Sequence, residues 1–177
     1  MDRRSSIKTL FIISAAAALL PSCLHEEKKP SLSKKNIKID GKDENLLSEL
    51  SETIIPKTNT PGAKDVKASA FAFMMLDDCY APGDQDKFVK GMKEFNEFSK
   101  KKFNKSFVDC SAAERLDVIK IIEDNKDVPE NVSYFFNSMK RLTIQAYTSS
   151  EYYLTKVRIY PLVPGKFYGC VPVKKAS

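Results

Sequence analysis

The sequence predicts an all-α fold: a single compact domain of five or six helices followed by an irregular C-terminal segment rich in proline and glycine. Apolar residues recur at steps of three and four in several segments, which is the spacing of an amphipathic helix. No segment shows the long alternation of β-branched residues that a sheet needs. The chain has 177 residues, 42% of them hydrophobic, which is enough for one domain with its own core.

The first two predicted helices flank a loop. Residues 43–55 place four aliphatic side chains on one face, namely Leu46, Leu47, Leu50 and Ile54. Pro56 ends that helix because the residue before a proline is pushed into an extended conformation. The following loop contains Pro61-Gly62, which suits a type II turn. Residues 66–80 are apolar almost all round, a pattern that predicts a buried helix.

Three amphipathic segments and one short helix complete the predicted domain. Residues 84–103 carry an inward stripe of Phe88, Met92, Phe95 and Phe98. Ser111 and Glu114 form a capping box before a helix whose inward face would be Leu116, Ile119 and Ile122. Residues 131–147 hold Phe135, Met139, Leu142 and Ala146 in register. Thr148 and Glu151 suggest a second capping box, for a short helix that ends near Val157.

Residues 1–22 have the organisation of a signal peptide. Arg3, Arg4 and Lys8 precede an apolar run from Leu10 to Leu20, which is too short to cross a bilayer comfortably. The arginine pair resembles a twin-arginine signal, although Ser6 stands where that pattern prefers a large apolar residue, so export by the Sec route stays open. An uncleaved membrane anchor is the other alternative.

Leu20-Pro21-Ser22-Cys23 resembles a bacterial lipobox, in which the cysteine receives a lipid. A lipid on Cys23 would tether the exported protein to the membrane on the periplasmic side of the cell envelope. Ordinary cleavage without lipidation remains possible. Residues 23–42 are polar and rich in lysine, and we expect a flexible tether there, with the helical domain occupying residues 43–177.

The composition excludes several function classes. The one histidine, His25, lies outside the domain, which excludes Ser-His-Asp and Cys-His nucleophiles and HExxH metal sites. The glycines do not form a nucleotide-binding loop, and no CxxC exists for haem or zinc. We therefore predict no catalytic, cofactor-binding or metal-binding residue. Net charge is +6 with acids and bases interleaved, so we expect no nucleic-acid partner.

After Cys23 three cysteines remain, which allows at most one internal disulfide. Cys79 and Cys110 could bridge two helix ends, leaving Cys170 as a spare thiol that could pair with another chain. Three free thiols are the alternative.

Three segments resemble the gluconate 2-dehydrogenase subunit 3 family: ETIIPKTNTPGAKD at 52–65, AYTSSEYYLTKV at 146–157 and YPLVPGKFYGCVP at 160–172. The resemblance implies a non-catalytic accessory subunit that assists maturation and export of a large dehydrogenase subunit of the glucose-methanol-choline type. That partner would carry the FAD, and a cytochrome c subunit often accepts the electrons. The alternative is a stand-alone helical lipoprotein of the envelope, acting as a structural or binding module.

The last of these segments is also a candidate interface. Residues 160–173 carry one charge, Lys166, and hold residue types that anchor protein interfaces. We expect partner contacts from Tyr160, Pro161, Val163, Pro164, Phe167, Tyr168 and Cys170. Alternatively, the segment folds back and covers helices of its own domain.

Overall fold

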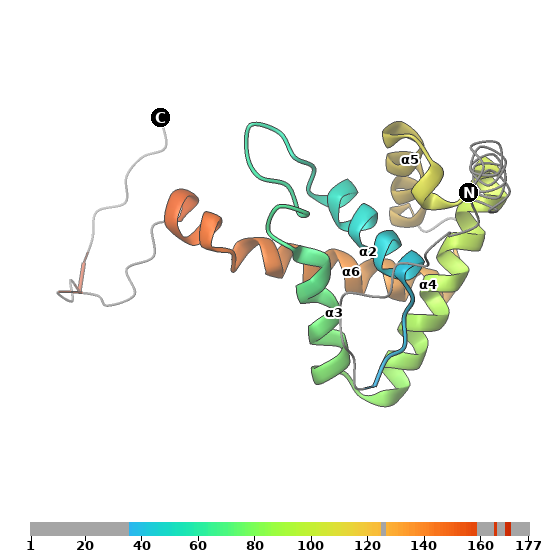
Figure 1. Ribbon diagram of the computed structural model, residues 1–177, viewed down its shortest axis with the longest axis horizontal. Coiled ribbons are helices and arrows are strands. Elements are labelled where there is room, and N and C mark those ends of the chain that lie inside the picture. Colours follow the sequence, from blue (N-terminus) through green and yellow to red (C-terminus); the bar gives the residue numbers. More distant parts are fainter. Residues whose placement is uncertain (1–35, 125–126, 159–164, 166–168, 171–177) are drawn as a thin grey trace, which may run out of the picture.

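The computed structural model describes residues 36–124, 127–158, 165 and 169–170, and it contains helices and no strands in these residues (Figure 1). The predicted all-α fold is confirmed. The elements are α2 (Gly41–Ile54), α3 (Ala68–Cys79), α4 (Pro82–Phe103), the 3₁₀ turn η1 (Phe107–Asp109), α5 (Ala112–Glu123), α6 (Glu130–Thr148) and the π-helical turn η2 (Tyr153–Val157).

Helices α4 and α6 pack along each other and form the centre of the core. The Phe135 ring of α6 lies 4.9 Å from the ring centroid of Phe88 and 5.3 Å from that of Phe95, both in α4. Phe95 also contacts Phe107 of η1, at 5.0 Å between centroids. The predicted stripes of both helices are buried: Phe88, Met92, Phe95 and Phe98 in α4, and Phe135, Met139, Leu142 and Ala146 in α6.

The two helices are in close contact at Gly91. A Cβ atom built there would lie 2.2 Å from the backbone oxygen of Asn131 and 2.8 Å from Cβ of Phe135. These distances are far below ordinary contact, so a side chain at Gly91 would hold α4 and α6 apart. The glycine therefore sets the spacing of the central pair.

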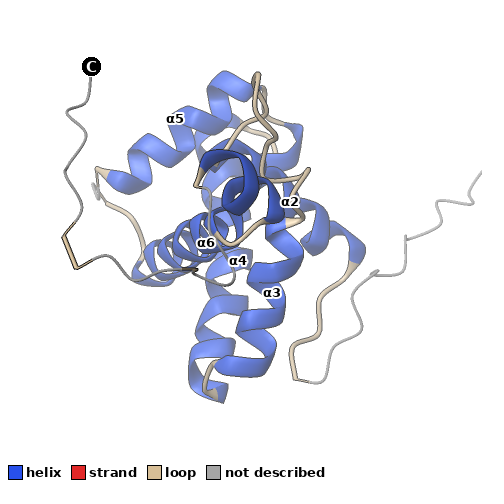
Figure 2. Ribbon diagram, turned by 90° about the vertical axis from the view of Figure 1, so that its left-hand side faces the viewer, coloured by secondary structure: helices blue, strands red, loops and turns tan. Residues whose placement is uncertain are grey.

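Helices α2 and α3 pack against α6 (Figure 2). Leu46, Leu47 and Leu50 of α2 are buried as predicted. Ser51 Oγ of α2 and Thr143 Oγ1 of α6 form a buried hydrogen bond of 3.2 Å. This bond satisfies two hydroxyl groups that would otherwise be buried without a partner.

Helix α3 differs from the fully buried helix that its composition predicts. Ala72, Phe73 and Leu76 are buried, but Met74 is 52% exposed. The helix therefore covers the core with one face and leaves an apolar residue on the other.

The capping box of α5 forms as predicted: Glu114 N donates to Ser111 Oγ, and Ser111 N donates to Glu114 Oε2 at 2.7 Å. The predicted inward face is wrong at Leu116, which is 46% exposed, whereas Val118, Ile119 and Ile122 are buried. The inward position of the first turn belongs instead to Arg115, whose guanidinium group reaches backbone carbonyls of η1.

The predicted tether over residues 23–42 is too long at its C-terminal end. Ile37 is 3% and Ile39 is 8% exposed, and both belong to the core. The buried carboxylate of Asp77 accepts hydrogen bonds from Asn36 N at 3.0 Å and Ile37 N at 2.7 Å. Asp40 then caps α2, which starts at Gly41. Alternating isoleucines in an otherwise polar segment therefore make residues 36–40 an extended part of the domain.

The structure does not contain the bridge considered between Cys79 and Cys110, because both are free thiols. Cys79 is exposed at the end of α3, whereas Cys110 is buried after η1 with its sulfur 3.6 Å from Ser99 Oγ of α4.

Candidate functional site

The loop between α2 and α3 and the end of α6 come together into one surface region, although Pro61 and Tyr147, which join them, are 86 positions apart in the sequence. The Tyr147 hydroxyl of α6 donates to the Pro61 carbonyl at 3.0 Å. Ala63 and Ala68 of the loop and of the start of α3 are buried together with Ala146 of α6. We call the loop residues 56–67 the marker loop, because they contain most of the first quoted motif.

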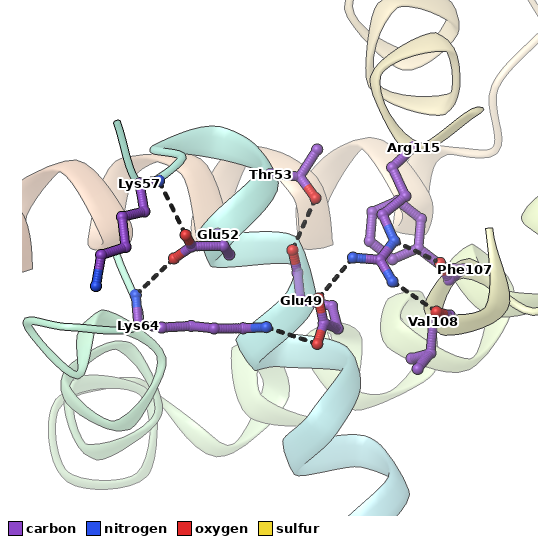
Figure 3. A network of polar contacts seen from close by, with 8 residues as sticks. All are labelled: Glu49, Glu52, Thr53, Lys57, Lys64, Phe107, Val108 and Arg115. Carbon is purple, nitrogen blue, oxygen red and sulfur yellow. Dashed lines mark hydrogen bonds and ion pairs between the residues drawn. The ribbon is translucent and has the colours of Figure 1, made fainter. Parts of the chain in front are cut away.

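Glu52, in the last turn of α2, shapes the marker loop from inside (Figure 3). Its two carboxylate oxygens accept hydrogen bonds from the backbone amides of Lys57 and Lys64, each at 2.9 Å. The Glu52 side chain thus connects the beginning of the loop, at Lys57, to its second half, at Lys64. The Ala63 amide closes the loop by donating to the Ile55 carbonyl at 2.9 Å.

Gly62 is required by this close approach. A Cβ atom there would lie 2.5 Å from Glu52 Oε1 and 2.7 Å from the amide nitrogen of Lys57. The amide of Gly62 also donates to Asp65 Oδ2 at 2.9 Å. This bond and the Lys57 ammonium, 3.1 Å from Asp65 Oδ1, lower the pKa of Asp65 below its usual 3.8. The shape of the loop is therefore fixed by Glu52 of α2 and by the loop residue Asp65.

A second network ties the marker loop to the far side of α2 (Figure 3). Glu49 accepts from Lys64 Nζ at 2.6 Å and from Arg115 Nη1 at 2.5 Å. Arg115 also donates to the carbonyls of Phe107 at 3.1 Å and Val108 at 2.5 Å. Partial burial of Glu49 acts to raise its pKa, but the two cationic hydrogen-bond donors outweigh it and the pKa falls below 4.5.

The end of α6 is organised by Ser150 rather than by the predicted Thr148. Thr148 Oγ1 donates back to the Ile144 carbonyl at 2.9 Å, inside the helix. The amide of Tyr153 donates to Ser150 Oγ at 3.2 Å, and the π-helical turn η2 begins at that tyrosine. The ring of Tyr147 lies 6.3 Å from that of Tyr153, in an edge-on arrangement. Turns of this type are rare and occur often at functional sites.

A groove lies between the marker loop and the end of α6. Its volume is about 480 Å³, and it is lined on one side by Pro61, Asp65, Val66 and Lys67 and on the other by Ser150, Glu151, Tyr152, Thr155 and Lys156. Lys67 has a backbone φ of 54°, which is uncommon for a residue with a side chain. We call this feature the marker groove.

Most of the predicted site residues lie outside the described part of the chain. These are the lipidation candidate Cys23 and the interface candidates Tyr160, Pro161, Val163, Pro164, Phe167 and Tyr168. Cys170 is described and is an exposed free thiol. Sequence reasoning missed the structural roles of Glu49 and Arg115.

The described residues contain neither a candidate metal site nor a candidate membrane span. They contain no group of three or more histidine, cysteine, aspartate or glutamate side chains that could hold a metal ion. The two networks around α2 are instead built from backbone amides, carbonyls and ion pairs that hold a loop. None of the described helices is both long and apolar enough to cross a membrane.

A family model described as gluconate 2-dehydrogenase subunit 3 matches residues 42–165. The chain belongs to this family. The family description names one subunit of a dehydrogenase, so the chain is a small accessory subunit of a dehydrogenase complex. The match includes both segments that form the marker groove. Searches of curated proteins and of solved structures gave no significant match.

Proposed function

We propose that this subunit 3 chain assists the maturation, export and anchoring of a large FAD-dependent dehydrogenase subunit of the glucose-methanol-choline type. The membership of the family carries the proposal. The chain itself contributes a binding surface and no chemistry, and the partner holds the FAD. A cytochrome c subunit would accept the electrons of the complex.

The design of the surface supports a binding role. Glu52 of α2 accepts hydrogen bonds from two backbone amides of the marker loop and Asp65 from a third, so little loop entropy remains to be lost when a partner binds. The tyrosine-rich end of α6 adds a residue type that is enriched in the centres of interfaces. The C-terminal segment, whose described residues Gly165, Gly169 and Cys170 are exposed, would extend this surface.

The N-terminal residues assign the chain to the envelope in this proposal. A signal peptide over residues 1–22 and a lipid on Cys23 would place the complex at the periplasmic face of the membrane. The folded segment 36–40 shortens the tether to residues 24–35 and therefore keeps the domain close to that surface.

Deletion and complementation in the native host would test the proposal. Loss of the chain should reduce the flavin subunit in the envelope fraction, and the intact chain should restore it. Complementation with Cys23→Ala should restore export but release the complex from the membrane. Unchanged amounts of every envelope flavoprotein after deletion would instead support a stand-alone envelope lipoprotein.

A further inference from the structure

The marker groove is not selective for a charged ligand. Two cationic side chains, Lys67 and Lys156, and two anionic ones, Asp65 and Glu151, line it. The formal charges of the lining cancel, and Lys57, which pairs with Asp65, lies outside the lining. The apolar lining comes from Pro61, Val66 and Tyr152. A groove of this composition suits an uncharged, extended peptide with apolar side chains.

The chain itself carries such a peptide next to the groove. Helical turn η2 ends at Val157, one residue after Lys156, which lines the groove. Residues 159–173 then follow with three prolines and the single charge of Lys166. Fifteen extended residues reach about 50 Å, and Pro164-Gly165 provides a turn that can reverse their direction.

We propose that the marker groove seats the C-terminal segment 159–173 of the same chain. Prolines lower the ordering cost of a docked extended segment, and aromatic side chains supply its contact area. Gly165, Gly169 and Cys170, which are exposed, belong to the outer face of the segment. The docked segment would then present that face to a partner. The inference concerns the isolated chain, so it can fail while the proposed function holds, and the reverse.

Hydrogen exchange measured by mass spectrometry would test the docking directly. The full chain is compared with a variant that ends at Arg158. The proposal predicts that the full chain exchanges about tenfold more slowly over residues 61–67 and 150–156, and equally over residues 90–100 of α4, which serve as the internal control. Equal exchange of the two chains in the groove segments would overturn it.

A groove variant makes the test independent of truncation. Thr155 is exposed and lines the groove, so Thr155→Glu places a charge where the segment would lie. Ile144→Glu is the matched control, because Ile144 is exposed on α6 and does not line the groove. In the intact chain, trypsin should cleave after Lys166 about tenfold faster in Thr155→Glu than in wild type, and no faster in Ile144→Glu.

Two results would contradict the proposal. Cleavage after Lys166 at the same rate in all three proteins would show that the groove does not protect the segment. Protection that increases with protein concentration would show that the groove binds the segment of a second copy. Circular dichroism of each variant confirms that the helices are intact before the rates are compared.

Discussion

Replacing Gly91 by alanine and replacing Gly83 by alanine should change stability in opposite directions, although both glycines lie in α4. At Gly91 the added Cβ atom would lie 2.2 Å from the Asn131 carbonyl oxygen and 2.8 Å from Phe135 Cβ. At Gly83 no atom lies within 4 Å of the added Cβ atom. The pair therefore isolates the close contact of α4 and α6 from the helix propensity of alanine.

The magnitude follows from these distances. An ordinary Cβ contact begins at 3.4 Å, so the two helices must separate by roughly 1 Å at Gly91. Overpacking of this kind costs about 1–3 kcal/mol, and the higher helix propensity of alanine returns about 0.5–1 kcal/mol. Because the 2.2 Å contact is with a backbone oxygen that cannot rotate away, the upper part of the overpacking range applies, and we expect Gly91→Ala to lower the free energy of unfolding by about 1–2 kcal/mol. Gly83→Ala should raise it by up to about 1 kcal/mol.

Urea denaturation followed by far-ultraviolet circular dichroism measures both values under the same conditions. The midpoint should fall for Gly91→Ala and stay or rise for Gly83→Ala, with little change in the slope of the transition. If Gly91→Ala were as stable as wild type, the close packing of α4 against α6 would be refuted. A loss of stability in both variants would refute the interpretation that the contact, and not the helix, is responsible.

Three further predictions concern the polar contacts and the thiols. Glu49→Gln should lower stability by about 1 kcal/mol at pH 7, as measured by urea denaturation. Because the folded pKa of Glu49 lies below 4.5, this difference should be complete above pH 4.5 and should shrink as the pH falls through the folded pKa; equal stability of the two proteins at pH 7 would argue against the ion pairs. Asp77→Ala should cost about 2–3 kcal/mol, since the buried carboxylate accepts two backbone hydrogen bonds, and a change of less than about 0.5 kcal/mol would speak against this role. In the native protein iodoacetamide should modify Cys79 and Cys170 quickly and Cys110 only after unfolding, as read by mass spectrometry; rapid labelling of Cys110 would contradict its burial.

The periodicity of apolar residues correctly predicted which faces of α4 and α6 are buried. In α4 the residues Phe88, Met92, Phe95 and Phe98 all face the core, because a long helix with one wide apolar stripe has only one way to bury it. The same reasoning holds for the stripe of α6. Sequence spacing was sufficient wherever burial decides which side of a helix faces inward.

The pattern failed where a polar group occupies an inward position. In α5 the guanidinium of Arg115 faces η1 and bonds its carbonyls, which a hydrophobic pattern cannot indicate. Ile37 and Ile39 lie in a lysine-rich segment that composition alone marks as polar, yet they fill the core beside a buried carboxylate. Both cases depend on long-range hydrogen bonds, whose partners are not visible from local sequence.

The sequence motifs identified the two segments that form the marker groove, but they did not indicate the hydrogen bonds that bring these segments together. The quoted motifs identified the marker loop and the end of α6 separately. The sequence gives no sign that Tyr147 bonds the Pro61 carbonyl, or that Glu52 bridges two backbone amides across the loop. Gly62 could be recognised as a turn residue, but the reason for it is the carboxylate of Glu52 against its backbone.

Co-purification tests the central claim most directly. The full chain, carrying a C-terminal affinity tag, is isolated from detergent-solubilised envelopes of its native host, and the eluate is examined by mass spectrometry and for flavin absorbance. We expect a large flavoprotein in equal molar amount, with its flavin bound. Elution of the chain alone, or with partners that carry no flavin, would contradict it.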